Sequence, residues 1–464
     1  MMRKTLAQVL ADYAVNLHYD QLPKASIERA KEVILDASAN FINGRFDAAA
    51  VPLLQYAKSI SEEVKTEATF TFLSEQDYAL STRAAIFAYC AMGRMADMDD
   101  GFSKAMGHPG SFLVPTLLIM GKLHKISGKE AIAALVAAYD VYARIAEALN
   151  PYMHRERGFD ATGVCGSVAA AALLARIMKC DSGQAANAMG LAGTFSGGII
   201  ECQQDGTSGK YLCGAWAALN GLRAVDLARA GFTGSPQILE GKRGLFQAFQ
   251  SSHGFETDHV LDSLGKLFKI NEVYFKRFAC LRGVHATLDA ALQLKESYHL
   301  VPEQIEKVEI RASSYLLRFA EPYPKTEISA QSSLPFTTAV VLLYGKLDSA
   351  EFLRECLKDE TVSRFEERII VKYDSDLEAY LKEHPSHFSA SKVVVYTSSG
   401  KILTHTQHIP IGETKETKFG WDMVASKFTH LVEKTPFGVL NQQYIHQIQQ
   451  LEYCNALSEI FVLK

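Results

Sequence analysis

The chain has 464 residues, 48% of them hydrophobic, which is too long for one ordinary hydrophobic core, so we expect an ordered globular protein of two domains. Its formal net charge of -4, from 48 basic and 52 acidic residues, gives no electrostatic basis for binding nucleic acid. No apolar run approaches the roughly 18 residues of a membrane span, and polar residues interrupt the N-terminus too early for a signal peptide. We therefore expect a cytoplasmic protein without a nucleic-acid or membrane partner.

Apolar residues recur at helical spacing from the start of the chain to about residue 270, and turn signals separate these stretches. Ser127 and Glu130 fit a capping box that opens a helix ending near Leu149. Residues 168–177 are apolar almost all round, which predicts a central helix. We therefore expect residues 1–270 to form an all-helical domain.

The pattern changes near residue 300, where short runs of strand length and rich in β-branched residues begin. These runs are 305–311, 369–373, 391–396 and 401–405, and Ser398-Ser399-Gly400 forms a turn between the last two. They predict a small α+β domain over residues 271–412. Helical periodicity returns from about residue 418, in 419–432 and 441–456.

The segment 94–115 holds the densest group of candidate catalytic residues. Asp97, Asp99 and Asp100 lie close together, and His108 follows within a Gly-Pro turn. Because Gly and Pro end helices, we expect a carboxylate-rich helix end beside a loop that carries the histidine. Such a place can hold an acid and a base of different pKa, as proton transfer requires. Asp97 is a plausible base only if burial or the neighbouring carboxylates raise its pKa.

Two further clusters suit an anionic substrate. A Gly-rich stretch ends in Lys210 and opens an apolar helix, and helix-start amides beside a lysine make a good carboxylate clamp. The glycine spacing of a phosphate-binding P-loop is missing there. Lys276, Arg277, Arg282 and His285 lie within ten residues of one another. They could bind a di- or tricarboxylate, the arginines bidentately.

The sequence offers no pattern for a metal site. Its eight cysteines are scattered, without a Cys-x-x-Cys pair, and no His-Glu-x-x-His motif occurs. We therefore expect neither a metal ion nor another cofactor.

Six motifs follow one another along the chain. They are Asp97-Met98-Asp99-Asp100 with His108-Pro109, Arg157-Gly158-Phe159 with Thr162-Gly163, Gly209-Lys210-Tyr211-Leu212 with Gly214, Gly231-Phe232-Thr233-Gly234 with Leu239-Glu240-Gly241, Phe275-Lys276-Arg277-Phe278 with Arg282 and His285, and Ser333-Leu334-Pro335-Phe336. In kind and order they resemble the MmgE/PrpD family, which includes 2-methylcitrate dehydratase, cis-aconitate decarboxylase and iminodisuccinate epimerase. The resemblance implies a mainly α fold, with a large all-helical domain, to which residues 413–464 return, and a smaller inserted α+β lid domain. It also implies a homodimer, and the Ala- and Gly-rich helices of residues 161–231 would permit one.

The chain departs from what the dehydratase and decarboxylase branches of this family usually carry. Asp160 stands where a histidine usually follows the Gly-Phe pair. Ala279 and Leu281 stand where a proline, and then a cysteine or histidine, usually follow the lysine. Arg318 lies near the place of an active-site tyrosine of the decarboxylase branch. These changes alter the available acids and bases but leave the expected carboxylate-binding frame largely intact.

Asp160 carries the most specific expectation. If the site has been rebuilt rather than lost, we expect Asp160 to face the substrate pocket, either as a base or as a group that orients Lys210 or His108. A carboxylate there would repel a polyanion unless a cation pairs with it, and Arg318 or Arg282 is the expected partner.

The predicted site combines residues from all of these segments. The catalytic candidates are Asp97, His108, Asp160 and Lys210, and the substrate-binding candidates are Gly101, Lys104, Tyr152, Lys276, Arg277, Arg282, His285 and Arg318.

The function implied is a cofactor-independent enzyme that removes the proton α to a carboxylate of a small di- or tricarboxylate, as 2-methylcitrate dehydratase-type lyases do. One alternative is an epimerase of the iminodisuccinate type, in which two groups exchange a proton on opposite faces of one carbon, and Lys104 with Tyr152 could form that pair. Another alternative is a carboxylate-binding protein on the same fold that has lost its catalysis, because the side chains at Asp160 and Leu281 differ from those usual in the family.

Overall fold

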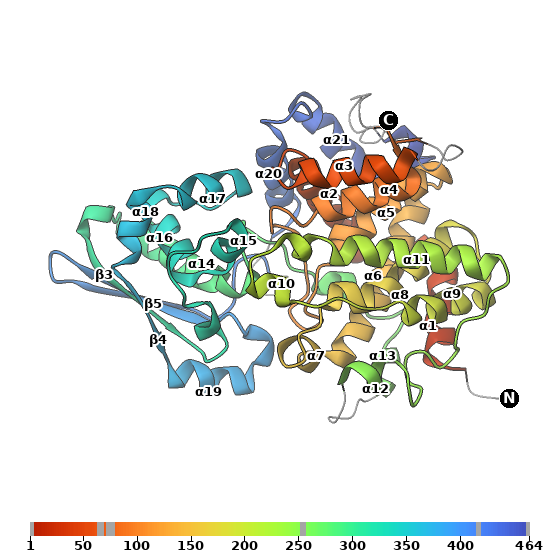
Figure 1. The fold of residues 1–464 in the computed structure, drawn as a ribbon, viewed down its shortest axis with the longest axis horizontal. Coiled ribbons are helices and arrows are strands. Elements are labelled where there is room, and N and C mark those ends of the chain that lie inside the picture. Colours follow the sequence, from red (N-terminus) through yellow and green to blue (C-terminus); the bar gives the residue numbers. More distant parts are fainter. Residues whose placement is uncertain (1–3, 63–68, 71–78, 251–256, 414–418, 461–464) are drawn as a thin grey trace.

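The protein is described here from a computed structural model, which covers residues 4–62, 69–70, 79–250, 257–413 and 419–460. Figure 1 shows a large helical lobe and a smaller lobe built around a sheet. We call the large lobe, helices α1 to α13 with α20 and α21, the body, and the small lobe, α14 to β6, the lid. The predicted mainly α fold with a smaller α+β part is confirmed.

The body is built almost entirely from helices. These are α1 (Leu6–Asn16), α2 (Lys24–Gly44), α3 (Ala50–Glu62), α4 (Thr82–Met92), α5 (Gly110–Leu123), α6 (Gly128–Leu149), α7 (Tyr152–Arg155), α8 (Ala161–Ile177), α9 (Ser182–Thr194), α10 (Glu201–Gln204), α11 (Cys213–Arg229), α12 (Leu245–Gln250), α13 (Thr257–Leu261), α20 (Trp421–Val432) and α21 (Asn441–Gln449). Two short strands, β1 (Thr69–Phe70) and β2 (Leu80–Ser81), pair antiparallel beside them.

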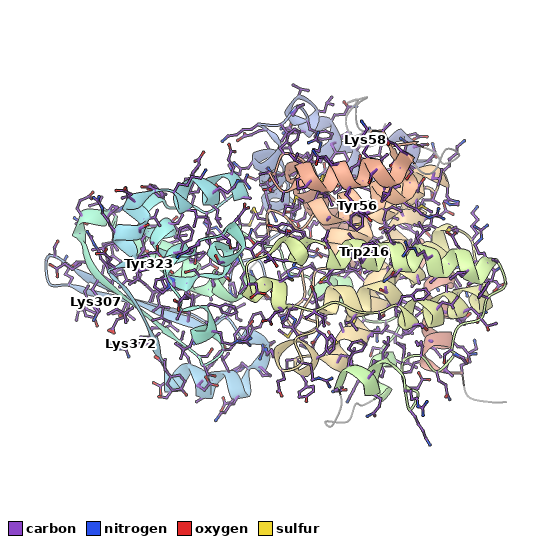
Figure 2. The ribbon with its side chains drawn as sticks, in the orientation of Figure 1. Tyr56, Lys58, Trp216, Lys307, Tyr323 and Lys372 are labelled. Carbon is purple, nitrogen blue, oxygen red and sulfur yellow. The ribbon has the colours of Figure 1, made fainter. Side chains whose placement is uncertain are left out.

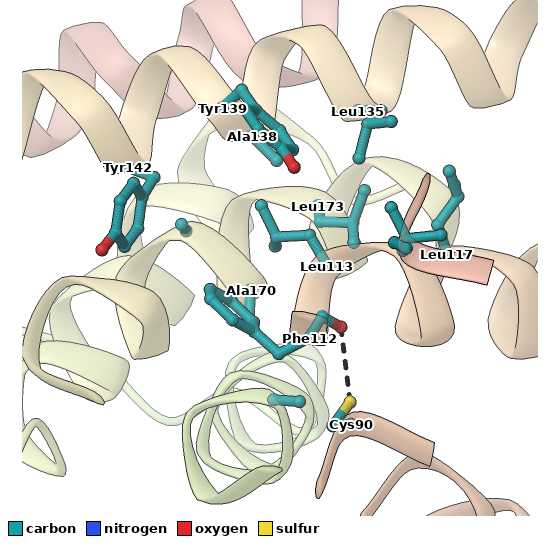
Figure 3. Packing of buried hydrophobic residues seen from close by; sticks show 14 of the residues in the cluster. Cys90, Phe112, Leu113, Leu117, Leu135, Ala138, Tyr139, Tyr142, Ala170 and Leu173 are labelled. Atoms are coloured by element: carbon teal, nitrogen blue, oxygen red, sulfur yellow. Dashed lines mark hydrogen bonds between the residues drawn. The ribbon is translucent and has the colours of Figure 1, made fainter. Parts of the chain in front are cut away.

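Helix α8 lies at the centre of the body, as its apolar sequence predicts. All of its residues are buried except Arg176, which is half-buried. Side chains of α5 and α6, among them Phe112 and Tyr139, pack around it (Figure 3). A Cβ at Gly221 of α11 would lie 2.6 Å from the Cβ of Ala170, so the backbone of α11 runs directly against α8. The small residues of this stretch therefore serve close helix packing.

The predicted start of α6 is confirmed in detail. Ser127 Oγ accepts a hydrogen bond from the Glu130 amide at 3.2 Å, and the Glu130 carboxylate accepts one from the Ser127 amide at 2.8 Å. This reciprocal capping satisfies amides that the first helical turn leaves without a partner.

The lid carries one mixed sheet of four strands in the order β4-β3-β5-β6. The strands are β3 (Ile305–Ala312), β4 (Ile369–Tyr373), β5 (Ser391–Thr397) and β6 (Ile402–Gln407), and the helices are α14 (His285–Ser297), α15 (Glu327–Ser332), α16 (Leu334–Tyr344), α17 (Ala350–Leu357), α18 (Glu360–Glu366) and α19 (Ser375–Glu383). All four predicted strands are confirmed, including the hairpin between β5 and β6. Helices α14 and α16 pack against the sheet and close the separate core of the lid.

The last two helices pack against the body. Val424 and Phe428 of α20 belong to the hydrophobic core of the body, and α20 lies along α2. Lys427 Nζ binds Asp36 Oδ1 at 2.6 Å and the carbonyl oxygen of Met98 at 2.5 Å. Helix α20 thereby anchors the loop between α4 and α5, which carries Asp97, Asp99 and Asp100 and is called the Asp-rich loop below. The domain bounds at residues 270 and 413 stay a prediction.

Candidate active site

A buried carboxylate in the loop between α4 and α5 lies at the centre of the site. Asp97 has a φ of 51°, a left-handed conformation that Asp tolerates better than most residues, and is almost fully buried. Lys276 Nζ lies 2.7 Å from its Oδ1, and Lys210 Nζ lies 3.0 Å from its Oδ2. Three segments far apart in the sequence therefore meet in one charge cluster, formed by Asp97, Lys210 and Lys276.

The charge cluster fixes the protonation of its carboxylate. Burial alone would raise the pKa of Asp97, but the cations of Lys210 and Lys276 outweigh it and hold that pKa well below the usual range. Asp97 is therefore an ion-pairing anion at neutral pH, and the condition for it to act as a base, a raised pKa, is not met. Burial lowers the pKa of Lys210, and Asp97 opposes this change in part.

Lys210 connects the body to the lid. It lies in a short 3-10 turn, Ser208–Tyr211, just before α11, and is buried as its apolar surroundings suggest. Its Nζ donates to Gln331 Oε1 of α15 at 2.8 Å, and Gln331 Nε2 donates to the carbonyl oxygen of Met95 at 3.3 Å. The ammonium group is thus held by a body carboxylate and a lid amide together.

His108 and Asp99 form a second buried group beside the charge cluster. Arg94 Nη1 binds Asp99 Oδ2 at 2.6 Å, and His108 Nδ1 lies 2.8 Å from the carbonyl oxygen of Asp100. That carbonyl oxygen accepts a hydrogen bond from the Nδ1–H group, so Nε2 is the nitrogen with the free lone pair. Burial lowers the pKa of His108, and the Arg94 cation lowers it further. The imidazole is therefore neutral at neutral pH.

Asp100 is built into the frame of the loop. Its carboxylate accepts hydrogen bonds from Tyr139 OH at 2.7 Å and from the Gly110 amide at 2.9 Å. A Cβ at residue 110 would lie 2.2 Å from Asp100 Oδ1, so only glycine permits this approach. Burial raises the pKa of Asp100 to about 8, which keeps this carboxyl group largely protonated at neutral pH.

A cavity of about 590 Å³ opens between body and lid. Figure 1 shows α10 of the body facing α15 of the lid at this boundary. Residues of the body that line the cavity are Asp97, His154, Arg155, Glu156, Gly158, Ile200, Glu201, Gln203 and Lys210. Those of the lid and the segment leading to it are Leu281, Tyr315, Arg318, Phe319, Glu321, Pro322, Tyr323, Pro324, Lys325, Ile328, Ser329, Gln331, Ser332 and Ser333.

Of the twelve predicted site residues, Asp97, Lys210 and Arg318 line this cavity. Lys276 is fully buried behind Asp97, and His108 is partly buried near it. The structure therefore joins the Asp-rich segment and Lys210, two clusters that the sequence analysis treated separately.

The rest of the predicted carboxylate clamp does not converge on the cavity. Arg282 Nη2 binds Glu413 at 2.7 Å, and Arg277 Nη1 lies 3.4 Å from Asp289. His285 is fully buried, with Nε2 3.3 Å from the carbonyl oxygen of Cys280. The clustering of these residues in the sequence was misleading, because the chain turns between them and sends their side chains to different acids and carbonyls.

Three other candidates also lie outside the cavity lining. Lys104 is exposed, and Tyr152 is half-buried on α7. Gly101 exchanges backbone hydrogen bonds with Tyr274, at 3.2 and 2.9 Å, and so ties the Asp-rich loop to the segment that carries Lys276. The geometry therefore gives no support to Lys104 and Tyr152 as an opposed pair of proton-transfer groups.

Asp160 is not among the residues that line the cavity. Its Oδ1 accepts a hydrogen bond from the Thr162 amide at 2.8 Å, so the side chain is the N-cap of α8. It is buried, and Arg282, one of its two expected partners, is bound to Glu413. An aspartate directly before a long apolar helix is a sequence signal for an N-cap.

Two cavity residues, His154 and Arg155 at the end of α7, were missed. The guanidinium of Arg155 lies over the rings of two lid residues, 4.8 Å from the centroid of Tyr315 and 5.5 Å from that of Phe388. Their signal in the sequence is a His-Arg pair next to Tyr152, in a segment already regarded as close to the site. Only the contact with the lid distinguishes this pair from ordinary surface residues.

Comparison with known protein families gives matches over both lobes. The MmgE/PrpD N-terminal domain matches residues 8–258, and the MmgE/PrpD C-terminal domain matches residues 278–452. The second match includes α20 and most of α21, although both helices pack on the body.

Individual relatives are similar at low identity over most of their length. The Cis-aconitate decarboxylase-like protein oryM of Aspergillus oryzae is 24% identical over 98% of this chain and 96% of its own. The Cis-aconitate decarboxylase of Aspergillus terreus is 24% identical over 87% of this chain and 84% of its own. The 2-methylcitrate dehydratase of Salmonella typhi is 22% identical over 76% of this chain and 75% of its own.

No helix among the described residues is long and apolar enough to cross a membrane. Within the same ranges, no three His, Cys, Asp or Glu side chains are grouped so that they could hold a metal ion.

Proposed function

The chain belongs to the MmgE/PrpD family, and we propose that it is a cofactor-independent lyase that removes the proton α to a carboxylate of a small di- or tricarboxylate. The relatives named above are decarboxylases and dehydratases, which supports lyase chemistry in general. Dehydration of a hydroxylated tricarboxylate is the specific reaction proposed.

The observation that carries this proposal is the buried Lys210 ammonium at the wall of the cavity, paired with Asp97 and bound to Gln331. Loss of an α proton places negative charge on the oxygens of the adjacent carboxylate. A cation fixed in a site of low dielectric stabilises this developing charge strongly, because its partners already hold it in place before the reaction.

The cavity also offers cations for the remaining carboxylates of such a substrate. Arg155 of the body and Arg318 of the lid both line it, and neither has a carboxylate partner among the described ion pairs. Since arginine binds carboxylates bidentately, these two groups can anchor a polycarboxylate between the lobes. Glu156, Glu201 and Glu321 also line the cavity, and their charges limit how many anions it accepts.

Deuterium exchange tests the proposal directly. The protein is incubated in deuterated water with 2-methylcitrate, cis-aconitate or iminodisuccinate, and proton NMR follows solvent deuterium entering the ligand together with any product. Loss of water with exchange supports a dehydratase, and exchange with inversion but no elimination supports the epimerase instead. Dicarboxylates that raise the melting temperature without exchange or product would indicate a carboxylate-binding protein, since binding to the native state alone stabilises it.

We further propose that the protein is a cytoplasmic homodimer. Helix α8 is buried within one chain, so the body face near α11 is the candidate contact surface. Trp216 of α11 and Tyr56 of α3 are 40% and 45% exposed and lie on the same face of the body (Figure 2). Both rings pack edge-on against Phe87, which makes this apolar patch rigid. Light scattering at micromolar concentration tests the proposal, and a mass near one 51.1 kDa chain contradicts it.

A further inference from the structure

The Asp97 carboxylate is held as an ion-paired anion, and His108 is not among the residues that line the cavity, so the proposed chemistry still needs a base. We propose that His154 is the proton-transfer residue of this cavity and contacts the substrate through its imidazole ring. This inference rests on the proposed function.

The backbone holds His154 at the boundary between the lobes. Its amide donates to Asn150 Oδ1 at 3.2 Å, and Asn150 Nδ2 donates to the carbonyl oxygen of Ala105 at 2.6 Å. The following residue, Arg155, contacts the lid rings of Tyr315 and Phe388. The backbone of His154 is therefore held between the Asp-rich loop and the lid, which limits the positions open to its ring.

The ring nitrogen Nδ1 of His154 is buried and has no hydrogen-bond partner among the described residues. An unsatisfied buried polar atom is costly, and such atoms are usually paired in native proteins. His285 Nδ1 is unpaired as well, but that ring packs against Phe278 outside the cavity lining. His154, in contrast, lines the cavity, so a bound substrate can contact its ring from that side.

The charges around His154 suit a base. Burial lowers the pKa of His154. Asp160 before α8 and the backbone of Phe159 oppose this change, whereas Arg155 on the same helix and Arg318 on the lid add to it. The ring is therefore neutral at neutral pH and able to accept a proton. Through its charge, Asp160 favours the protonated ring.

With Lys210, the ring supplies the two proton transfers of a dehydration. His154 takes the α proton as the carbon–hydrogen bond breaks. The electron pair of that bond forms the carbon–carbon double bond. The carbon–oxygen bond breaks in turn, and the hydroxyl group leaves as water with a proton from the Lys210 ammonium. Proton exchange with solvent then restores both groups, so no oxidant, reductant or further reactant is needed.

The His154→Gln variant tests the inference in the deuterium-exchange assay. We expect exchange and turnover to fall at least 100-fold, the range typical of general-base loss, with little change in melting temperature. The matched control is His124→Gln, because His124 is also a histidine whose pKa burial lowers, at the end of α5, but it does not line the cavity. If His154→Gln does not fold, His154→Asn is judged by the same criterion.

The outcomes separate the inference from the proposed function. A wild-type protein that exchanges deuterium while His154→Gln stays within twofold of it would refute the role of His154 and leave the function intact. A wild-type protein that exchanges nothing would refute the function and this inference with it.

In an active protein, Asp160→Asn should move the acidic limb of the rate profile to lower pH, because it removes the carboxylate that favours the protonated ring. An unmoved limb would assign that limb to another group and overturn the inference.

Discussion

The charge cluster makes a strong prediction for Asp97→Asn. Asp97 is 1% exposed and is the counter-ion of two ammonium groups, at 2.7 Å and 3.0 Å. Its replacement by a neutral amide of the same size leaves no cavity but strands both lysine cations in a buried place. Removing one partner of a buried ion pair costs about 3 to 5 kcal/mol, which is the loss we expect in the free energy of unfolding.

Thermal unfolding measures this loss. Each kcal/mol lowers the melting temperature of a large domain by about 2 °C, so Asp97→Asn should melt roughly 6 to 10 °C below the wild type. The deficit should shrink as the pH rises toward about 10. Burial lowers the pKa of Lys210 and Asp97 opposes this change, so without Asp97 that pKa falls further in the folded protein. The folded protein then loses this proton at a lower pH than the unfolded chain does, so its stability recovers as the pH rises toward the lysine pKa of the unfolded chain.

The matched control is Asp226→Asn. Asp226 pairs with Arg83 at 3.1 Å, but both side chains are more than one-third exposed, so this change should cost at most about 1 kcal/mol. If Asp97→Asn and Asp226→Asn melt together, the three buried charges do not stabilise one another, and the cluster is not the electrostatic centre that we describe.

Three further variants test other parts of the site. Lys210→Gln should lower turnover at least 100-fold, because it removes the cation that stabilises the developing charge, while Asp97 keeps Lys276 as its partner. Because burial raises the pKa of Asp100 to about 8, only the folded protein holds this proton between about pH 4 and 8. Wild-type stability to urea should therefore fall as the pH rises through that range, and Asp100→Asn should make the fall shallower. Arg155→Gln should raise KM at least about tenfold, because a charge-assisted hydrogen bond contributes about 1.5 to 3 kcal/mol.

Each of these variants has a control on the lid surface. Lys346→Gln, in an exposed pair with Asp348, and Arg364→Gln, on α18, should leave KM and kcat unchanged. Asp359 accepts a hydrogen bond from a tyrosine hydroxyl, as Asp100 does, but its pKa is lowered by that bond, so Asp359→Asn should not make the pH dependence shallower. If a variant and its control change KM, kcat or the pH dependence of stability equally, the position of the charged group at the site does not determine these properties.

Local sequence determined much of the fold. The runs that became β3, β4, β5 and β6 were identified from their length and β-branched content, since those properties depend on neighbouring residues alone. The capping box of Ser127 and the central position of α8 follow equally local rules. The N-cap role of Asp160 follows from a local rule as well, because an aspartate directly before an apolar helix accepts a hydrogen bond from an amide of its first turn.

Only the tertiary structure decided which charged side chains meet. Lys276 and Arg282 are six positions apart and looked alike in the sequence, yet one binds Asp97 and the other binds Glu413. Lys210 is 113 residues from Asp97 and lies 3.0 Å from it. A charged side chain has the same chemistry in a buried pair, on the surface or at a cavity wall, and burial and partner distance set its pKa and its role. The sequence therefore determined the family, the elements and the candidate residue types, and the packing of lid on body decided which of them share a site.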